Sequence, residues 1–475
     1  MMGTVRYPSY RDSGLPWVPE IPEGWQVLRN GRLFAHRVQT GFPDLPILEV
    51  SLRTGVRVRD MENLKRKQVM SQKEKYKRAA KGDIAYNMMR MWQGALGAAP
   101  VDGLVSPAYV VASPFPEVNS AYFSYLFRTA AYMREVNKFS RGIVSDRNRL
   151  YWDEFKQMPS LLPPRVEQDQ IVAYLRVQDA HIARFIKAKR DLISLLNEQK
   201  LRIIDHAVMR GLDTSVALKP SGIEWLGDIP EHWDISRLGS CIKTSRAGIW
   251  GSEPSERNLA DQLICVRVAD FDMERLAVDI GKLTVRAVTP SDRSGRLLCP
   301  GDILLEKSGG GDKTPVGRVV AFTLDEASVC SNFVARLVPN TQIVRPAFLL
   351  TLMNHLHARR IVIPYIKQTT GIQNLDSMAY FKLGVALPSL DEQDKIVYAL
   401  EEQCKSLNDA INRAKDEIKL IHEYRDRLIA DIVTGQIDVR DWVPGPDDVV
   451  AEEDLAALGG DEDIEADGGE DDGEE

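Results

Sequence analysis

The chain has 475 residues, of which 44% are hydrophobic and 27% are charged, so it is long enough for two or more folded domains. No apolar run reaches the roughly 20 residues that a membrane-spanning helix needs, and the first residues lack the apolar core of a signal peptide. The five cysteines are scattered without a C-x-x-C pair, which argues against a disulfide framework or a cysteine-based zinc site and favours the reducing cytoplasm.

The net charge of −7 conceals two oppositely charged parts. Residues 446–475 contain fifteen Asp and Glu and no Lys or Arg, so the preceding 445 residues carry a net charge of +8. We expect residues 437–475 to be a disordered acidic tail, because a Gly/Asp/Glu-rich segment cannot build a core. The basic remainder favours a polyanionic partner.

An unusual pentapeptide, Ile-Pro-Glu-x-Trp, occurs at residues 21–25 and again at residues 229–233. In both copies a Ser-Gly pair begins eight residues before the Ile, and a Trp lies four residues before it. Because the chain has only eight Trp, this shared spacing predicts an internal duplication.

Residues 1–160 are expected to form the first of two mixed α/β domains. Residues 82–89 and 103–113 have the apolar, β-branched composition of strands, and residues 119–139 have a helical pattern. Between residues 53 and 81 lie eleven Lys and Arg against three Asp and Glu. Such a stretch can bind phosphates, although a plain solvated surface can have the same composition.

Residues 161–212 and 388–436 are expected to form two long helices. Both contain Glu-Gln-Asp-x-Ile-Val, and apolar residues then recur every three or four positions over about five heptads. A helix with one apolar stripe needs a partner, and each has one in its twin; about 38 residues would span roughly 57 Å. The predicted seam residues are Ile171, Leu175, Ile182, Leu192, Leu196 and Ile203 in the first helix, and Ile396, Leu400, Leu407, Ile421 and Leu428 in the second.

Residues 213–387 are expected to form the second mixed α/β domain. Residues 301–311 and 317–322 have the pattern of strands, and residues 345–362 have the pattern of a helix. The glycine-rich stretch between these strands is not a nucleotide phosphate loop, because Asp312 stands where that motif needs a glycine directly before Lys-Thr. We interpret it as a turn that lets the backbone approach a ligand or a neighbouring segment.

Motifs for catalysis are weak or missing. Glu-x-Lys occurs at residues 154–156 and 417–419, but neither copy follows the Pro-Asp strand of a nuclease site. The seven histidines have no metal-ligand spacing. We therefore expect no catalytic residue and no metal site.

Several motifs in order resemble the specificity subunits of type I restriction-modification systems. They are GLVSPAYVV at 103–111, SGIEWLGDIPEHWDISRL at 221–238, GDILLEKSGGGDKTPVGRVV at 301–320, LPSLDEQDKIVYAL at 387–400 and LIADIVTGQIDV at 428–439. The resemblance covers nearly all of residues 12–440, and the acidic tail lies outside it.

The resemblance implies an α+β fold in which two mixed α/β target recognition domains are joined by two long helices. The helices would form an antiparallel coiled coil with a pseudo-twofold repeat. Each domain would read one half of a bipartite, asymmetric site in double-stranded DNA, and the coiled coil would set the spacer between the halves. The subunit itself would be non-catalytic and hold no cofactor. It would recruit two methylation subunits, which use S-adenosylmethionine, and two motor-nuclease subunits, which use ATP and Mg²⁺.

Cations and amides on the two domains are the candidate DNA contacts, because phosphates position a protein on DNA and polar side chains read the base edges. The candidates are Lys73, Lys75, Lys77, Arg90 and Gln93 in the first domain, and Lys307, Lys313, Lys367, Gln368 and Gln373 in the second. Two other classes of protein remain open. One is a single-chain nuclease or methyltransferase with its own active site, and the other is a protein-interaction scaffold built on the coiled coil.

Overall fold

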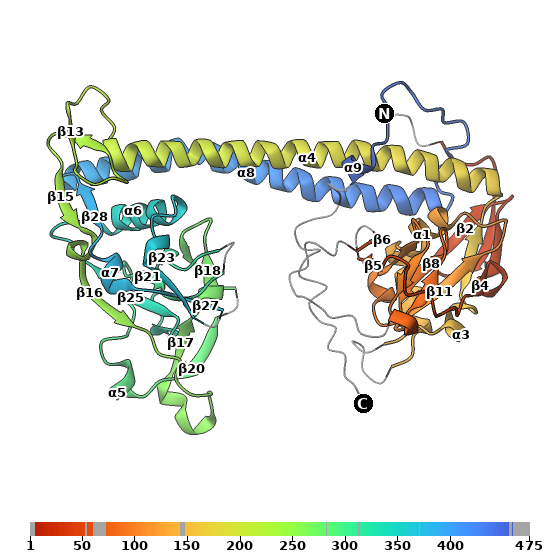
Figure 1. Ribbon diagram of the computed structural model, residues 1–475, viewed down its shortest axis with the longest axis horizontal. Coiled ribbons are helices and arrows are strands. Elements are labelled where there is room, and N and C mark those ends of the chain that lie inside the picture. The colour runs from red at the N-terminus through yellow and green to blue at the C-terminus, as the bar shows by residue number, and fades with distance from the viewer. Residues whose placement is uncertain are drawn as a thin grey trace. The chain divides into compact units, whose positions relative to one another are not determined.

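The computed structural model describes residues 5–52, 55–59, 73–142, 148–281, 283–311, 314–369, 371–455 and 458. It divides into two compact units (Figure 1). Unit 1 comprises residues 1–192 and 413–475, and unit 2 comprises residues 193–412. The sequence places domain boundaries where the globules meet the helices, whereas the compact units divide both helices internally. Each unit therefore combines one globule with a part of each long helix.

The globule of unit 1 contains an antiparallel sheet with strand order β4-β11-β8-β9. These strands are β4 (Phe34–His36), β8 (Ile84–Asn87), β9 (Leu96–Ala98) and β11 (Tyr109–Pro114). Two helices follow, α1 (Ser120–Phe127) and α2 (Ala130–Phe139). The side chains of Asn119 and Thr129 accept hydrogen bonds from the first backbone N–H groups of these helices, so the helical segment predicted over 119–139 is two capped helices.

Shorter strand pairs complete the globule of unit 1. They are β1 (Tyr10–Leu15) with β2 (Val18–Pro22), β3 (Gln26–Arg29) with β12 (Pro159–Leu162), β5 (Leu48–Ser51) with β6 (Gly55–Val58), and β7 (Lys77–Ala79) with β10 (Gly103–Val105). Helix α3 (Trp152–Phe155) precedes β12. The core is rich in aromatic rings; the ring of Phe34 lies 5.3 Å from that of Phe123, edge to face.

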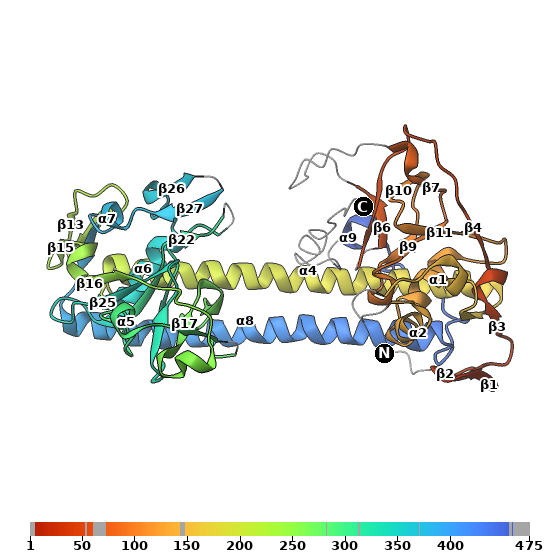
Figure 2. The same ribbon diagram turned by 90° about the horizontal axis from the view of Figure 1, so that it is seen from below.

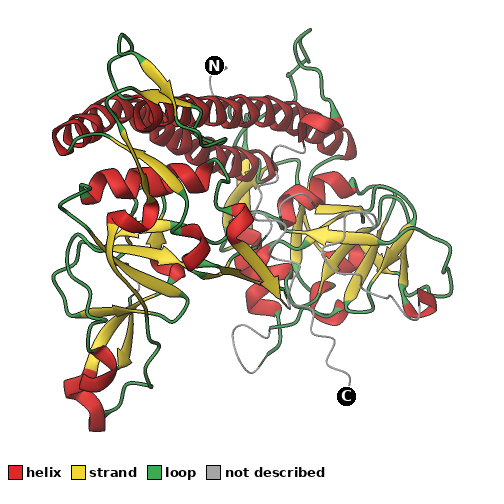
Figure 3. Cartoon of the chain, turned by 60° about the vertical axis from the view of Figure 1, so that its left-hand side comes forward, coloured by secondary structure: helices red, strands yellow, loops and turns green. Residues whose placement is uncertain are grey.

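The globule of unit 2 contains a larger sheet with strand order β16-β25-β21-β23-β19-β18. Figure 3 draws the strands of the chain in yellow and its helices in red. These strands are β16 (Ile242–Ala247), β18 (Phe271–Asp272), β19 (Ala277–Val278), β21 (Ile303–Glu306), β23 (Val319–Ala321) and β25 (Val334–Pro339). A second sheet has the order β20 (Thr284–Ala287), β17 (Gln262–Val266), β24 (Ser328–Cys330), and a third has the order β22 (Ser308–Gly309), β27 (Ile372–Leu375), β26 (Ile366–Thr369).

The remaining elements of unit 2 link its globule to the helices. They are β13 (Leu218–Pro220) with β14 (Asp228–Pro230), β15 (Asp234–Arg237) with β28 (Gly384–Leu387), and the helices α5 (Pro290–Arg293), α6 (Pro346–Ala358) and α7 (Ser377–Tyr380). The strands predicted at 301–311 and 317–322 and the helix predicted at 345–362 are confirmed as β21 with β22, β23 and α6.

The two predicted long helices are α4 (Arg165–Arg210) and α8 (Leu390–Val433), and they pack together in opposite directions (Figure 2). In unit 1, Arg425 of α8 donates to Asp179 of α4 at 2.6 Å, and Glu417 pairs with Lys189 further along α4. In unit 2, the Lys200 ammonium donates to Asn408 at 2.8 Å. As numbers rise along α4, those of its partners on α8 fall, which confirms the antiparallel coiled coil implied by the resemblance.

The predicted seam is well buried only near the globules. Ile171, Leu175 and Ile182 of α4 are buried, as are Ile396, Leu400 and Leu428 of α8, and Leu196, Ile203, Leu407 and Ile421 are half-buried. Leu192 has an exposed fraction of 40%, so its assignment to a buried seam is corrected. The physical reason is the helix register: the adjacent Ile193 is half-buried while Leu192 turns outward, and Ile411 and Ala414 are the buried residues of α8 at this level.

The repeated motifs form one junction in each unit between the globule and the start of a helix. In unit 1 the indole N–H of Trp25 donates to Glu167 of α4 at 2.9 Å, and the Tyr7 hydroxyl donates to the same carboxylate. In unit 2 the indole N–H of Trp233 donates to Glu392 of α8 at 3.0 Å. The Trp of Ile-Pro-Glu-x-Trp thus binds the Glu of Glu-Gln-Asp, which explains why the chain repeats both motifs.

The end of the opposite helix packs on the same junction. Gly435, just after α8, has a φ of +75°, and a Cβ there would lie 2.4 Å from Pro22 and 3.3 Å from the Trp25 ring. Gly211, just after α4, has a φ of +76°, and a Cβ there would lie 3.3 Å from the Trp233 ring. Glycine is needed at both positions because the left-handed backbone and the close aromatic ring leave no room for a side chain.

The first part of the predicted tail lies against α4. The ring of Trp442 packs edge to face on that of Tyr174 at 5.2 Å, and Asp448 lies 3.2 Å from His181. Arg184 donates to the Val449 carbonyl at 3.1 Å and lies 3.7 Å from the Asp454 carboxylate. Residues 437–455, which we call the strap, are therefore packed on unit 1, although the sequence places them in a disordered tail.

Replacing Glu167 with Ala should destabilise unit 1 by about 2–4 kcal/mol, because the buried Trp25 indole and the Tyr7 hydroxyl would lose their acceptor. Urea unfolding of the purified chain measures the change. Glu198→Ala is the matched control on the same helix, since this exposed residue makes only a surface pair with Arg202 and its loss should cost at most about 0.5 kcal/mol. Equal effects of the two substitutions would contradict the role of the junction.

Candidate nucleic-acid interface

The third sheet of unit 2 brings several predicted DNA contacts together. In this three-stranded ribbon, Lys367 of β26 pairs with Asn374 of β27, and Ser308 of β22 pairs with the same Asn374 from the other side. The Ser308 hydroxyl donates to the Asn374 side chain at 2.7 Å, and the Leu375 N–H donates to the Lys307 carbonyl at 2.8 Å. The ribbon thus joins Lys307 and Lys367, which are sixty positions apart in sequence.

One face of the ribbon is polar and open to solvent. Residues paired across antiparallel strands share a face, so Ser308, Lys367 and Asn374 lie together on it. Lys367 and Asn374 are exposed. Within the ribbon, β26 and β27 form a two-stranded hairpin that presents a cation and an amide, and a two-stranded ribbon of this kind fits a DNA major groove.

The opposite face of the ribbon is structural, which corrects the role expected for Gln373. This side chain is buried, and its carbonyl oxygen accepts a hydrogen bond from the Val316 N–H at 3.3 Å. It therefore holds the end of the glycine-rich loop and is not accessible to a ligand. Gln368 pairs with Gln373 at the exposed tip of the ribbon, and Lys313 lies outside the described residues.

Lys367 is paired without being immobilised. Its ammonium lies 2.7 Å from the Asp376 carboxylate, while its side chain is 73% exposed. The pair holds the pKa of Asp376 below its usual value through the hydrogen bond from Lys367. An exposed pair of this kind contributes little to stability because water screens it, so Lys367 can exchange Asp376 for a phosphate at little cost.

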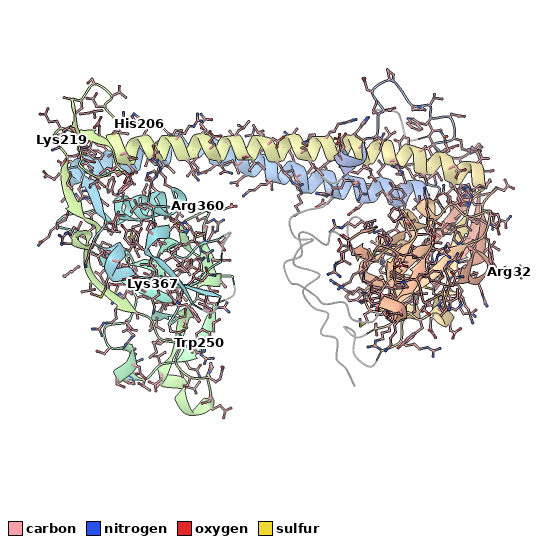
Figure 4. The ribbon with its side chains drawn as sticks, in the orientation of Figure 1. Arg32, His206, Lys219, Trp250, Arg360 and Lys367 are labelled. Atoms are coloured by element: carbon pink, nitrogen blue, oxygen red, sulfur yellow. The ribbon has the colours of Figure 1, made fainter. Side chains whose placement is uncertain are left out.

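Arg360 belongs to a basic cluster that the sequence offers for phosphate contacts, although it is not among the candidate residues given above. It follows the C-terminus of α6, is exposed, and has a φ of +59°, a conformation that a helix end usually gives to glycine. Figure 4 shows Arg360 and Lys367 on the globule of unit 2. The sequence carries a weak signal for this site, since Arg359 and Arg360 end the predicted helix where a glycine would be expected.

In unit 1, one of the predicted DNA contacts has a structural role. The Lys77 ammonium donates to the carbonyls of Pro107 and Tyr109 at 2.8 and 2.7 Å, so it holds two segments of the globule together. Burial lowers the pKa of Lys77. The expectation that Lys77 contacts DNA is therefore corrected, because two of the three N–H donors of its ammonium already bind carbonyls within the globule.

The other candidates in unit 1 lie on two separate turns. Lys73 and Lys75 belong to a single turn of 3-10 helix just before β7, and Lys75 is exposed. Arg90 and Gln93 flank the turn between β8 and β9, where the Arg90 guanidinium donates to the Gln93 side chain at 2.9 Å. Bonding between Arg90 and Gln93 can orient both groups toward a ligand.

Three cysteines of unit 2 lack the environment of a nucleophile. Burial raises the pKa of the Cys241 and Cys265 thiols to about 11 and that of Cys330 to about 12, so these groups are thiols at neutral pH. Among the residues that the structure describes, no group of three or more His, Cys, Asp or Glu is placed to hold a metal ion. No helix in the described part of the chain is long and apolar enough to cross a membrane.

Comparison with known proteins relates the chain to restriction-modification complexes. A chain from a structure titled as the basis of complex assembly and conformational transition of the type I R-M system matches with a TM-score of 0.60 and 14% identity, covering 88% of this chain and 99% of that one. The HsdS subunit from Thermoanaerobacter tengcongensis matches with a TM-score of 0.41 and 16% identity, covering 87% and 96%. The type I S subunit from M. genitalium matches with a TM-score of 0.32 and 12% identity, covering 86% and 96%. No protein-family model and no curated protein matches the sequence.

The chain has the fold of a subunit of a type I R-M system. That fold combines two α/β globules with a pair of long antiparallel helices. This agreement confirms the fold class predicted from the repeated sequence motifs.

Replacing Arg360 with Gly should stabilise unit 2 by about 1 kcal/mol, because glycine adopts a positive φ without steric cost. The expected result is a rise of about 2–4 °C in the melting temperature of unit 2. Arg359→Gly is the matched control: Arg359 has a φ of −77° and binds Asp205 at 2.7 Å, so this substitution should lower the melting temperature. A decrease with Arg360→Gly would contradict the inferred strain.

Proposed function

We propose that this chain is the DNA-reading specificity subunit of a type I restriction-modification complex and has no catalytic site of its own. The observation that carries the proposal is the exposed polar face of the ribbon in unit 2, which presents Lys367 and Asn374 on a globule of the matching fold. In this reading, cations such as Lys367 and Arg360 bind phosphates, and the Asn374 amide on the same face as Lys367 reads a base edge.

The two globules would read different half-sites. Among the described residues, the largest sheet of unit 1 has four strands and the largest sheet of unit 2 has six, and the two globules differ in sequence. Two different globules on one pair of helices would suit a bipartite, asymmetric target in double-stranded DNA. Continuous helices α4 and α8 would set the number of base pairs between the two halves.

Other polypeptides would supply the chemistry. We expect two methylation subunits that use S-adenosylmethionine and two motor-nuclease subunits that use ATP and Mg²⁺, with the assembled complex acting in the cytoplasm. The related structure concerns assembly of a type I R-M complex, which supports partner subunits in general. The buried, protonated cysteines of unit 2 also fit a binding role better than covalent catalysis.

The assignment can be tested by mapping modified bases in the native host with and without this gene. Loss of one asymmetric, bipartite methylation pattern is the expected result. Incubation of the purified chain alone with DNA, Mg²⁺, ATP and S-adenosylmethionine tests the rival enzyme reading, since cleavage or methyl transfer without partners would favour a single-chain enzyme. If the assembled complex shows no salt-dependent binding to DNA, an interaction scaffold is the better reading.

Inserting one heptad into each long helix should lengthen the spacer by about three base pairs, because seven helical residues span about 10.5 Å and a base pair rises about 3.4 Å. The insertions belong after the exposed positions Glu198 in α4 and Asp409 in α8. Methylation mapping gives the spacer and both half-sites, and the half-sites should not change. Insertion into α4 alone is the control and should abolish methylation, since it disrupts the pairing of α4 with α8. An unchanged spacer would rule out the coiled coil as the ruler.

Replacing Lys367 with Ala should weaken DNA binding uniformly across sequences and reduce the slope of log affinity against log salt concentration by about one. Asn374→Ala should instead relax discrimination at one position of one half-site, at about 1–3 kcal/mol. Fluorescence anisotropy of the complex with labelled duplexes at several salt concentrations measures both effects. Lys395→Ala, at an exposed lysine of α8, is the control and should leave the salt slope unchanged. A specificity change with Lys367→Ala would contradict its assignment to a phosphate.

A further inference from the structure

The loop that follows β16 holds one tryptophan rigidly at the surface of unit 2. A Cβ at Gly248 would lie 2.1 Å from the Cys330 carbonyl oxygen, and one at Gly251 would lie 2.4 Å from the Ala287 carbonyl oxygen. The Ile249 N–H donates to the Cys330 carbonyl at 2.7 Å, and Ser252 exchanges backbone hydrogen bonds with Ala287 at 2.9 and 3.0 Å. Trp250 stands between these fixed points and still has an exposed fraction of 38% (Figure 4).

A buried cation supports one face of the Trp250 ring. The guanidinium of Arg286 lies over the ring, 4.5 Å from its centroid, and its Nε donates to the Trp250 carbonyl at 3.2 Å. Arg286 is almost fully buried and also pairs with Glu253. A cation below the ring fixes its orientation, so the opposite face is left for a second planar group.

The space next to Trp250 is a hollow of about 500 Å³. Its lining includes the amide of Asn332 and the hydroxyls of Ser252 and Thr289. Asn332 is exposed and offers both a donor and an acceptor. An aromatic wall with a few fixed polar groups is the usual composition of a site for a planar, heteroatom-rich ligand.

Arginines lie along one side of this hollow. Arg296 donates to the carbonyls of Ala247 and Asp292, and Arg246 donates to the Ser294 carbonyl at 3.4 Å. Both arginines therefore sit beside the loop that carries Trp250 and beside Asp292, which lines the hollow. Guanidinium groups at such a rim can bind the phosphates on either side of a base.

Residues 332–333 link the lining of the hollow to the start of the ribbon. Asn332 of the lining precedes Phe333, whose side chain is 44% exposed, and the Phe333 carbonyl accepts hydrogen bonds from Lys307 at 2.9 Å and from Ser308 at 3.2 Å. A DNA duplex bound along the ribbon would therefore pass the mouth of the hollow. The sequence pointed to Lys307 and Lys367 at the ribbon, but it contained no signal for Trp250.

We propose that the Trp250 hollow takes one nucleobase of the bound DNA, unstacked from its neighbours and placed on the Trp250 ring. The Asn332 amide would then contact the polar edge of that base, and the arginines at the rim would bind its flanking phosphates. Stacking of a base on an aromatic side chain contributes about 1–3 kcal/mol, which is comparable with the cost of unstacking one base. The inference rests on the proposed function and adds a binding site for a single base.

The test uses the assembled complex and the mapped target. In a series of duplexes, each base of the half-site read by unit 2 is kept while its complementary base is replaced by an abasic residue, which lowers the cost of unstacking the retained base. Fluorescence anisotropy compares the wild type with Trp250→Ala, Trp250→Phe and Asn332→Ala. Tyr398→Ala is the matched control, since Tyr398 is an exposed aromatic residue on α8 of the same unit.

At one position the abasic partner should strengthen binding by the wild type about tenfold, since stacking contributes on the order of 1–3 kcal/mol. Trp250→Ala should abolish this gain, Trp250→Phe should retain most of it, and Tyr398→Ala should leave it unchanged. Asn332→Ala, which keeps the ring, should reduce the gain and provides the test if Trp250→Ala does not fold. A gain caused by a methylation subunit would be the same in all variants.

Equal gains in the wild type and in Trp250→Ala at every position would overturn the base site while leaving the proposed function intact. A complex that binds no DNA in a salt-dependent manner would overturn the proposed function and the base site together.

Discussion

The contact between a tryptophan indole and a glutamate at the start of each long helix organises the whole chain. Trp25 bonds to Glu167 in unit 1, and Trp233 bonds to Glu392 in unit 2, both close to 3 Å. Each contact joins the entry strand of a globule to the first turn of a helix, and the glycine that ends the other helix packs on the same ring. The direction of each helix is thereby fixed relative to its own globule, so the antiparallel pairing within each unit follows from the two junctions.

The glutamine after each of these glutamates secures the junction in the same way. Gln168 accepts from the Asn119 N–H at 2.8 Å and donates to the Pro163 carbonyl at 2.8 Å. Gln393 accepts from the Arg345 N–H at 2.7 Å and donates to the Pro388 carbonyl at 3.0 Å. The parts that position the globules are therefore the repeated ones, and the globules themselves are the parts that differ in sequence.

The sequence was sufficient to predict the long helices and the twin junctions, because heptads and repeated motifs are local signals. It also predicted that Lys307, Lys367 and Gln368 share a function, which the ribbon makes possible by strand pairing. The sequence did not predict the structural roles of Lys77 and Gln373. Lys77 binds the Pro107 carbonyl and Gln373 binds the Val316 N–H, and only the tertiary fold brings these partners close. Trp250 was missed for the same reason, since Arg286 and Asn332 are distant in sequence.

The strap creates a difference between the two repeated helices, because it packs on α4 in unit 1. It covers the face of α4 that carries Tyr174, His181 and Arg184 in unit 1, whereas Tyr398, at the corresponding turn of α8 in unit 2, is 67% exposed. Two identical proteins approaching these equivalent faces would meet an acidic peptide on one and an open aromatic helix on the other. The two helix faces therefore offer different contacts to any protein that binds them.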